Sequence, residues 1–247
     1  MVAGIESFLN KFRDYSDCYT IIGGAACDIL MDHYDVEFRI TKDIDMILIM
    51  EATFPEFAKV FWEYVLEGGY RMGWKNSVEA HFYRFTEPKA GYPSMIELFS
   101  RKTDYLKEIP EGIIPIHIDD ETSSLSAILL NDDFYNFMLE GRKVVSGASV
   151  LDPEHLIPFK MYAWLEYKDK KDRGEHVNER DLKKHKYDVF RLLQIADLES
   201  KIETTGLVRE SIDRFKEEIQ GESIPFAQLE LPFDMEWALE SIRSMYG

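Results

Sequence analysis

The 247-residue chain contains little cysteine, few basic side chains and no long hydrophobic run. Its two cysteines, Cys18 and Cys27, are too few for a disulfide framework or a zinc site, which favours a reducing compartment. Charged residues interrupt every apolar stretch before it reaches membrane-spanning length. The first residues also lack the basic start and apolar core of a secretory signal. These absences exclude a disulfide-stapled or membrane-spanning protein and predict a cytoplasmic one.

Basic residues are outnumbered, with 29 lysines and arginines against 46 aspartates and glutamates, a formal net charge of −17. Such a surface repels polyanions at long range, so non-specific nucleic-acid binding is not expected. It suits a cationic substrate or a protein partner. The basic stretch at residues 168–186 is the candidate for a local exception, and its alternative is a solvated basic face.

The hydrophobic patterning changes near residue 150. Before it, apolar strands alternate with amphipathic helices, and after it only helices are indicated. Asp152-Pro153-Glu154 has the form of a helix start, with Asp152 as N-cap and Pro153 at the first position. We therefore expect an α/β domain over residues 1–150 and a helical domain over residues 151–247. Strands are expected at 18–22, 43–50, 70–74, 81–85, 94–100, 113–118 and 143–149, and Gly147 is a candidate turn within the last of them. Helices are expected at 5–15, 25–34, 55–66, 152–167, 180–196, 201–220 and 233–245, a loop at 168–179, and a helix or strand at 134–139.

The most informative stretch runs from residue 21 to residue 50. An apolar strand ends in Gly23-Gly24, a helix follows, and the next strand carries Asp43 and Asp45 at its entry. The two aspartates are two residues apart, so they point to one face of the strand, where their charges repel unless a cation lies between them. Hard oxygen ligands suit Mg²⁺, and glycines at a helix start admit phosphate. The stretch predicts a site for a metal-bound triphosphate.

A single carboxylate, Glu97, lies inside the apolar strand expected at 94–100, where an unpaired charge is expensive to bury. Two explanations remain open. Glu97 pairs with a basic side chain, Arg84 or Arg101, or it is a third acid that faces Asp43 and Asp45.

The glycine pair and the sequence Arg39-x-Thr41-x-Asp43-x-Asp45 resemble the nucleotidyltransferase superfamily of polymerase-beta-like enzymes, in the style of its AbiEii/AbiGii-toxin-type branch. The resemblance implies a mixed sheet flanked by helices, followed by a helical domain that completes the active-site cleft. It implies an enzyme that moves a nucleotidyl group from a nucleoside triphosphate with the help of Mg²⁺, with two ions expected.

The resemblance also implies roles for particular residues. Asp43, Asp45 and Glu97 would be catalytic and would hold the metal. Gly23 and Gly24 would bind the nucleotide, together with Thr41 and Lys160.

In the helical half, Lys160 would ordinarily be a lysine that extends to solvent from a packed helix. Enzymes of the AbiEii-type branch carry a lysine in a segment similar to residues 152–163, and the resemblance implies that Lys160 holds the triphosphate. They also carry a later catalytic aspartate. Asp181 is the preferred candidate, and Asp188 is kept open.

The sequence does not identify the acceptor. An RNA or protein acceptor would make the chain the toxin of an abortive-infection pair, with an antitoxin protein as partner. The alternatives are a cationic small molecule, as for aminoglycoside nucleotidyltransferases, and a catalytically inactive relative that binds a nucleotide or a partner.

Overall fold

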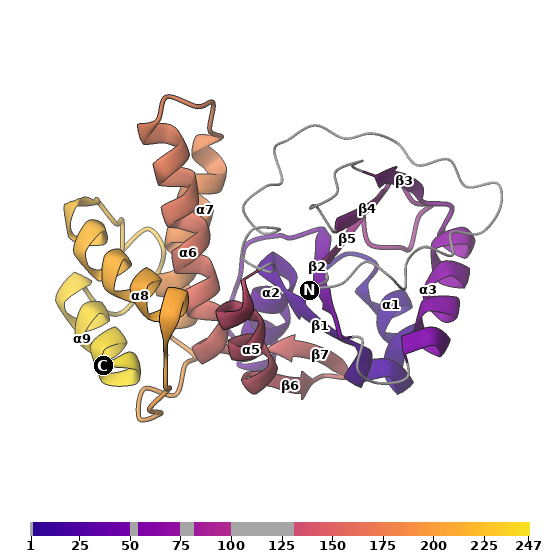
Figure 1. The fold of residues 1–247 in the computed structure, drawn as a ribbon, viewed down its shortest axis with the longest axis horizontal. Coiled ribbons are helices and arrows are strands. Elements are labelled where there is room, and N and C mark those ends of the chain that lie inside the picture. The colour runs from indigo at the N-terminus through magenta and orange to yellow at the C-terminus, as the bar shows by residue number, and fades with distance from the viewer. Residues whose placement is uncertain (1, 50–53, 75–81, 100–130) are drawn as a thin grey trace. The chain divides into compact units, whose positions relative to one another are not determined.

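The computed structural model describes residues 2–49, 54–74, 82–99 and 131–247, and it divides into two compact units. Unit 1 comprises Met1–Leu130 and Arg142–Leu151, and unit 2 comprises Asn131–Gly141 and Asp152–Gly247. One short segment of unit 2 therefore precedes the last hairpin of unit 1 (Figure 1). The strand expected at 113–118 lies outside the described residues.

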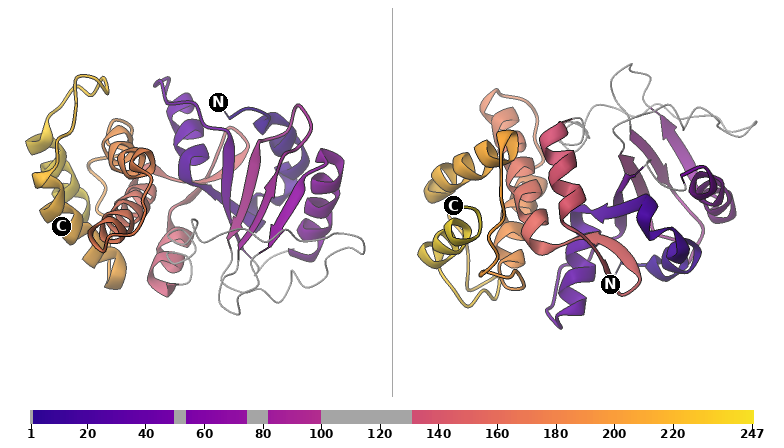
Figure 2. Two further views of the ribbon diagram at one scale, coloured as in Figure 1. Left: turned by 90° about the horizontal axis from the view of Figure 1, so that it is seen from above. Right: turned by 60° about the horizontal axis from the view of Figure 1, so that its bottom comes forward.

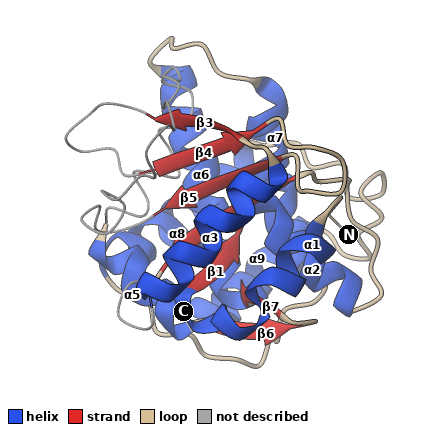
Figure 3. Cartoon of the chain, turned by 90° about the vertical axis from the view of Figure 1, so that its right-hand side faces the viewer, coloured by secondary structure: helices blue, strands red, loops and turns tan. Residues whose placement is uncertain are grey.

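Unit 1 is built on a mixed sheet of seven described strands in the order β3-β4-β5-β2-β1-β7-β6 (Figure 3). β2 pairs in parallel with β5, and β1 with β7, while the other neighbours are antiparallel. The predicted fold class, a mixed α/β sheet with flanking helices and a helical segment after it, is confirmed. The strands are β1 (Tyr19–Ile22), β2 (Asp43–Leu48), β3 (Arg71–Trp74), β4 (Phe82–Thr86), β5 (Met95–Phe99), β6 (Arg142–Val145) and β7 (Ala148–Leu151).

Helices α1 (Ile5–Phe12) and α3 (Phe54–Gly68) cover one face of this sheet, and α2 (Gly23–His33) lies on the other (Figure 2). Aromatic rings fill the first interface. Phe57 of α3 stacks on Tyr19 of β1 with ring centroids 6.1 Å apart, and Phe61 meets Phe85 of β4 edge-on at 5.3 Å. Alternation along the strands sends the neighbouring residues to the opposite face, beside α2.

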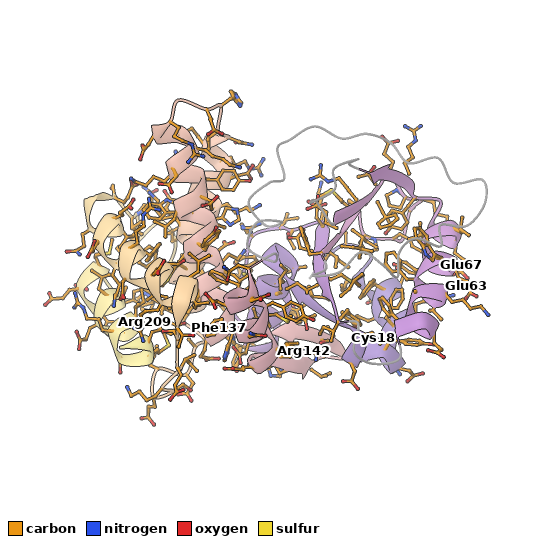
Figure 4. The ribbon with its side chains drawn as sticks, viewed as in Figure 1. Cys18, Glu63, Glu67, Phe137, Arg142 and Arg209 are labelled. Atoms are coloured by element: carbon orange, nitrogen blue, oxygen red, sulfur yellow. The ribbon has the colours of Figure 1, made fainter. Side chains whose placement is uncertain are left out.

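Ion pairs on the surface support the same packing. Glu63 and Glu67, labelled on α3 in Figure 4, lie 3.8 Å and 3.0 Å from Nζ of Lys11 on α1. Such pairs are partly exposed and contribute little beside the rings.

Three sequence predictions in unit 1 need correction. Cys18 does not lie on the first strand, because a 3₁₀ helix (Arg13–Cys18) ends there. Helix α2 begins at Gly23, earlier than the predicted residue 25. The strand predicted at 143–149 is a hairpin of two strands that turns at Ser146 and at the candidate turn residue Gly147. Both residues have positive φ, 51° and 84°, the backbone of a tight hairpin turn.

Unit 2 consists of helices, and the predicted helix start at Asp152 is confirmed, because its carboxylate accepts the His155 backbone N–H at 2.8 Å. The segment that sequence alone left untyped is helix α5, capped by Asn131. In the described part of the chain, no helix is both long enough and apolar enough to cross a membrane. The helices are α5 (Asp132–Glu140), α6 (Pro153–Asp172), α7 (Glu179–Leu192), α8 (Gly206–Glu218), a 3₁₀ turn (Ile219–Gly221) and α9 (Met235–Tyr246).

The loop predicted at 168–179 is wrong in its first part, because α6 continues to Asp172. Lys168 pairs with Asp172 one turn on at 3.1 Å and with Glu218 of α8 at 2.8 Å. Asp169 accepts from Arg214 of α8 at 2.8 Å. Lys168, in the basic stretch, therefore pairs with acidic neighbours. This pairing favours the alternative of a solvated basic face.

Helix α6 contains Pro158, which has no N–H to donate to the carbonyl of Glu154 one turn back. The hydroxyl of Tyr246, at the end of α9, donates to that carbonyl at 2.6 Å in a buried hydrogen bond. The bond replaces the missing helical donor and joins the last helix to the first turn of α6.

Candidate functional site

The candidate site begins at the corner between β1 and α2. Gly23 opens the helix with φ of 68°, a conformation that favours glycine. A Cβ atom at Gly23 would lie 2.0 Å from Oδ2 of Asp45, so the aspartate carboxylate occupies the space that only a glycine leaves. The same two strands align Ile22 with Asp45 in the antiparallel ladder. The predicted glycine and the predicted acid therefore meet at the start of α2.

The second glycine meets the residues that precede the acids. A Cβ at Gly24 would lie 2.7 Å from Oγ1 of Thr41 and 3.3 Å from a guanidinium nitrogen of Arg39. The Arg39 guanidinium also lies over the ring of Phe38, 4.9 Å from its centroid. A hydroxyl and a cation thus flank the first turn of α2, whose backbone N–H groups favour an anion.

The third acid lies on the next strand of the sheet. Parallel pairing sets Asp45 directly beside Glu97, and Asp43 beside Met95. Because side chains alternate, Asp43, Asp45 and Glu97 share one face of the sheet, the face that α2 covers. The common face predicted for Asp43 and Asp45 therefore also carries Glu97, whose position the sequence had left open.

Arg84 completes this face from β4. It stands directly opposite Glu97 in the antiparallel β4–β5 ladder, and its Nε donates to Glu97 Oε1. The two side chains are 18% and 6% exposed, so the ion pair is largely shielded from water. Both explanations left open for Glu97 hold in part: it pairs with Arg84, and it lies beside Asp45.

The surroundings of Glu97 make its proton easier to retain. Burial, and next the negative charge of Asp45, raise its pKa to about 7, while Arg84 opposes the shift. A carboxyl group with a pKa near neutrality is suited to accept a proton at cellular pH.

The resemblance implies Mg²⁺, and the donor set fits that ion in part. Asp43 and Asp45 offer hard oxygen ligands beside a helix start with room for phosphate, which matches the preference of Mg²⁺ for one or two carboxylates plus phosphate oxygens. Glu97 already gives one oxygen to Arg84. Accordingly, within residues 2–49, 54–74, 82–99 and 131–247, no three His, Cys, Asp or Glu side chains gather closely enough to hold a metal ion.

The predicted site residues of the helical half belong to unit 2. Lys160 is 2% exposed, so it does not extend to solvent, and its Nζ donates to Oδ2 of Asp188 at 3.0 Å. Asp188 is fully buried and also lies 3.5 Å from Arg191. Asp181 instead lies on the half-exposed first turn of α7, 3.6 Å from Lys184. The acid joined to Lys160 is therefore Asp188, whereas Asp181 makes a separate pair with Lys184.

Sequence reasoning missed this Lys160–Asp188 pair, although a signal for it exists. Asp188 stands beside apolar residues in α7, as Lys160 does in α6, and opposite charges on two apolar helix faces favour a mutual pair.

Comparison with known proteins adds little. No protein-family model matches the chain, and no curated protein matches it. Among solved structures, an antigenic nucleotidyltransferase-like protein from Paracoccidioides brasiliensis is 12% identical with a TM-score of 0.45, over 99% of this chain and 91% of that one. The antibiotic-resistance factor ANT(2'')-Ia is 14% identical with a TM-score of 0.41, over 92% of this chain and 93% of that one. Both similarities are too slight to say what this chain does.

Proposed function

We propose that the chain transfers a nucleotidyl group from a nucleoside triphosphate to an acceptor, with Mg²⁺ held by Asp43 and Asp45. The observation that carries the proposal is the contact of the Asp45 carboxylate with Gly23 at the start of α2. It joins a metal-ligand carboxylate and a phosphate-attracting helix start in one corner. Neither feature alone would be specific, but a metal-bound triphosphate needs both at once.

In this proposal the backbone N–H groups of Gly23 and Gly24 bind the phosphates, and Thr41 and Arg39 contact them from the side. Mg²⁺, when bound, neutralises charge on the phosphate oxygens. Glu97 takes the proton of the acceptor hydroxyl, whose oxygen attacks the α-phosphorus. The bond from that phosphorus to the bridging oxygen breaks, and pyrophosphate leaves.

For the helical half, a phosphate-binding role for Lys160 and a catalytic role for Asp181 stay predictions. The buried partnership of Lys160 with Asp188 supports a structural role as well. Substitution of Lys160 therefore has to be read for stability and for nucleotide affinity together.

Two acceptor classes follow from different premises. The resemblance to AbiEii-type toxins favours an RNA or protein acceptor and an antitoxin partner. The net charge of −17 favours a cationic small molecule such as an aminoglycoside. Each class receives the same nucleotidyl group from the same site.

Labelled transfer separates these classes. The protein is incubated with α-phosphate-labelled nucleoside triphosphates and either cell extract or a set of aminoglycosides, and label is sought in RNA, protein and small cations. Asp45→Asn should abolish transfer, whereas Asp172→Asn, the same change at a largely exposed carboxylate of α6, should not. Label nowhere, with folded protein, would reject the transfer, and undiminished labelling by Asp45→Asn would reject the site.

A further inference from the structure

Three aromatic residues outside the proposed site lie where α9 begins: Phe226, Phe233 and Trp237, here called the aromatic patch. The indole of Trp237 stacks on the ring of Phe233, with centroids 4.4 Å apart and planes at 23°. Phe233 meets Phe226 edge-on at 6.0 Å, and Phe226 meets the buried Phe190 of α7 at 5.3 Å. The patch is therefore anchored to the core of unit 2 and holds its outermost ring in a fixed orientation.

That outermost ring is open to solvent. Trp237 is 41% exposed, although stacking on Phe233 covers one face of its indole. The exposed area therefore belongs to the other face and to the edges of the ring. A rigidly held tryptophan is among the side chains that most often dominate binding to a partner, because it offers a large contact area at little cost in entropy.

Acidic side chains flank the exposed ring. Asp234 and Glu240 lie three residues before and three residues after Trp237, which makes them its neighbours on the helix surface. The Asp234 carboxylate accepts the backbone N–H of Trp237 at 2.9 Å, which fixes the acid at the start of α9. Residues 223–242 contain no Lys, Arg or His, and their acids are the exposed Glu230, Asp234, Glu236 and Glu240. The aromatic patch therefore lies in a locally negative surface.

An exposed indole face beside carboxylates favours a cation. A guanidinium or ammonium group is attracted by the face of the ring and pairs with a carboxylate at its edge. Arginine suits both contacts better than lysine, because its planar group stacks on rings and binds a carboxylate in two places. Glu240 lies 3.4 Å from Arg243 and is 75% exposed, and an ion pair so open to water is weak and can be exchanged.

The same charge disfavours the other occupants of an aromatic surface. A second copy of this chain would bring like carboxylates together, and a nucleic acid would bring phosphates, so both are repelled. An apolar partner would desolvate carboxylates without pairing them. A small cation would reach only part of the surface, because Asp234 and Glu240 are about 9 Å apart along the helix axis. That span suits neighbouring side chains of a peptide.

We propose that the aromatic patch and the acids beside it form a docking surface for an arginine-containing basic segment of a partner protein. The open face of the Trp237 indole takes a guanidinium group, and the flanking carboxylates pair with the neighbouring basic side chains. This docking surface does not depend on the proposed nucleotidyl transfer, and loss of either leaves the other intact.

The test is titration with a tetra-arginine peptide, measured by calorimetry and by the indole N–H signal of Trp237 in nuclear magnetic resonance. We expect this signal to shift on binding, while the signal of the buried Trp164 stays in place. A tetra-citrulline peptide, which has nearly the same shape without the charge, should not bind. A tetra-lysine peptide should bind at least about threefold more weakly, because ammonium groups do not stack.

An aromatic control separates docking from general attraction to an acidic protein. Trp237→Ala should weaken tetra-arginine binding at least about tenfold, because the stacking contact is lost. Tyr34→Ala removes another exposed aromatic side chain, 45% exposed, which also has acids beside it in Asp32 and Asp35 but belongs to unit 1. It should change the affinity by less than about twofold.

A charge control completes the comparison. Glu236→Gln/Glu240→Gln should weaken tetra-arginine binding about tenfold, because two carboxylates beside the indole are lost. Glu63→Gln/Glu67→Gln changes the net charge equally at half-exposed acids of α3, and it should weaken binding by less than about twofold.

Equal losses within the aromatic pair of variants or within the charge pair would show unspecific attraction and overturn the proposal. Three other results would also overturn it, each by assigning the patch to another occupant. Tetra-citrulline binding of similar affinity would indicate an apolar partner, self-association that Trp237→Ala abolishes would indicate a second copy, and an equally tight aminoglycoside that shifts the Trp237 signal would indicate a small cation. If Trp237→Ala does not fold, the wild-type indole signal and Glu236→Gln/Glu240→Gln decide the question.

Discussion

Replacing Gly23 by alanine adds one carbon atom where the structure leaves no room for it. The left-handed backbone at Gly23, with φ of 68°, costs an alanine roughly 1–2 kcal/mol. The new Cβ would also lie 2.0 Å from Oδ2 of Asp45, so the carboxylate must turn away from its rotamer, at roughly 1 kcal/mol more. We expect Gly23→Ala to lower the free energy of unfolding by about 2–3 kcal/mol.

Gly147 provides the control, because it has the same kind of backbone without the neighbour. Its φ is 84°, and nothing lies within 4 Å of an added Cβ. Gly147→Ala should lose only the backbone part, roughly 1–2 kcal/mol, and should bind a Mg²⁺–nucleotide complex normally. Gly23→Ala should bind it at least about tenfold more weakly, since Asp45 is displaced. Urea unfolding measures the stability of each variant, and calorimetric titration measures its affinity for the nucleotide complex. Equal losses of stability and of affinity in the two variants would refute the reasoning.

Three further predictions concern buried polar groups. Lys160→Met leaves the fully buried carboxylate of Asp188 without its lysine and should destabilise the protein by about 3 kcal/mol in urea unfolding; a change under about 1 kcal/mol would contradict a buried ion pair. Tyr246→Phe removes the donor to the Glu154 carbonyl and should cost about 1–3 kcal/mol in the same assay; an unchanged midpoint would mean that another donor replaces it. The pKa of Glu97 is raised from 4.5 to about 7, so the folded state holds the extra proton, and the free energy of unfolding should fall as pH rises from about 4.5 to about 7. Glu97→Gln should remove that slope, on the order of 3 kcal/mol across the window, and an unaltered slope would contradict the shift.

The glycines and aspartates of the site could be predicted because they are local. Gly23 and Asp45 are joined by one helix and the loop at residues 34–42, and the strand–helix–strand pattern leaves few ways to arrange them. The pairing of Glu97 with Arg84 could not be predicted from the sequence, because it depends on the β4–β5 register. The other candidate, Arg101, lies outside the described residues. The pairing of Lys160 with Asp188 depends on how α6 packs against α7, which hydrophobic periodicity does not specify.

The errors in the fold have similar causes. The end of α6 is polar and basic, so periodicity ended the helix early, whereas ion pairs from Lys168 and Asp169 to α8 extend it. The two strands of the β6–β7 hairpin are hard to separate in the sequence, because Ser146 is not a typical residue for positive φ and only Gly147 indicates the turn. In both places tertiary contacts or backbone geometry outweighed local propensity.

Calorimetric titration of the protein with a non-hydrolysable nucleoside triphosphate, with and without Mg²⁺, tests the central claim most directly. We expect binding that requires Mg²⁺ and is lost in Asp45→Asn but retained in Asp172→Asn. Absence of binding in folded wild-type protein, or binding that Asp45→Asn leaves intact, would contradict a metal-bound triphosphate at the Gly23–Asp45 corner.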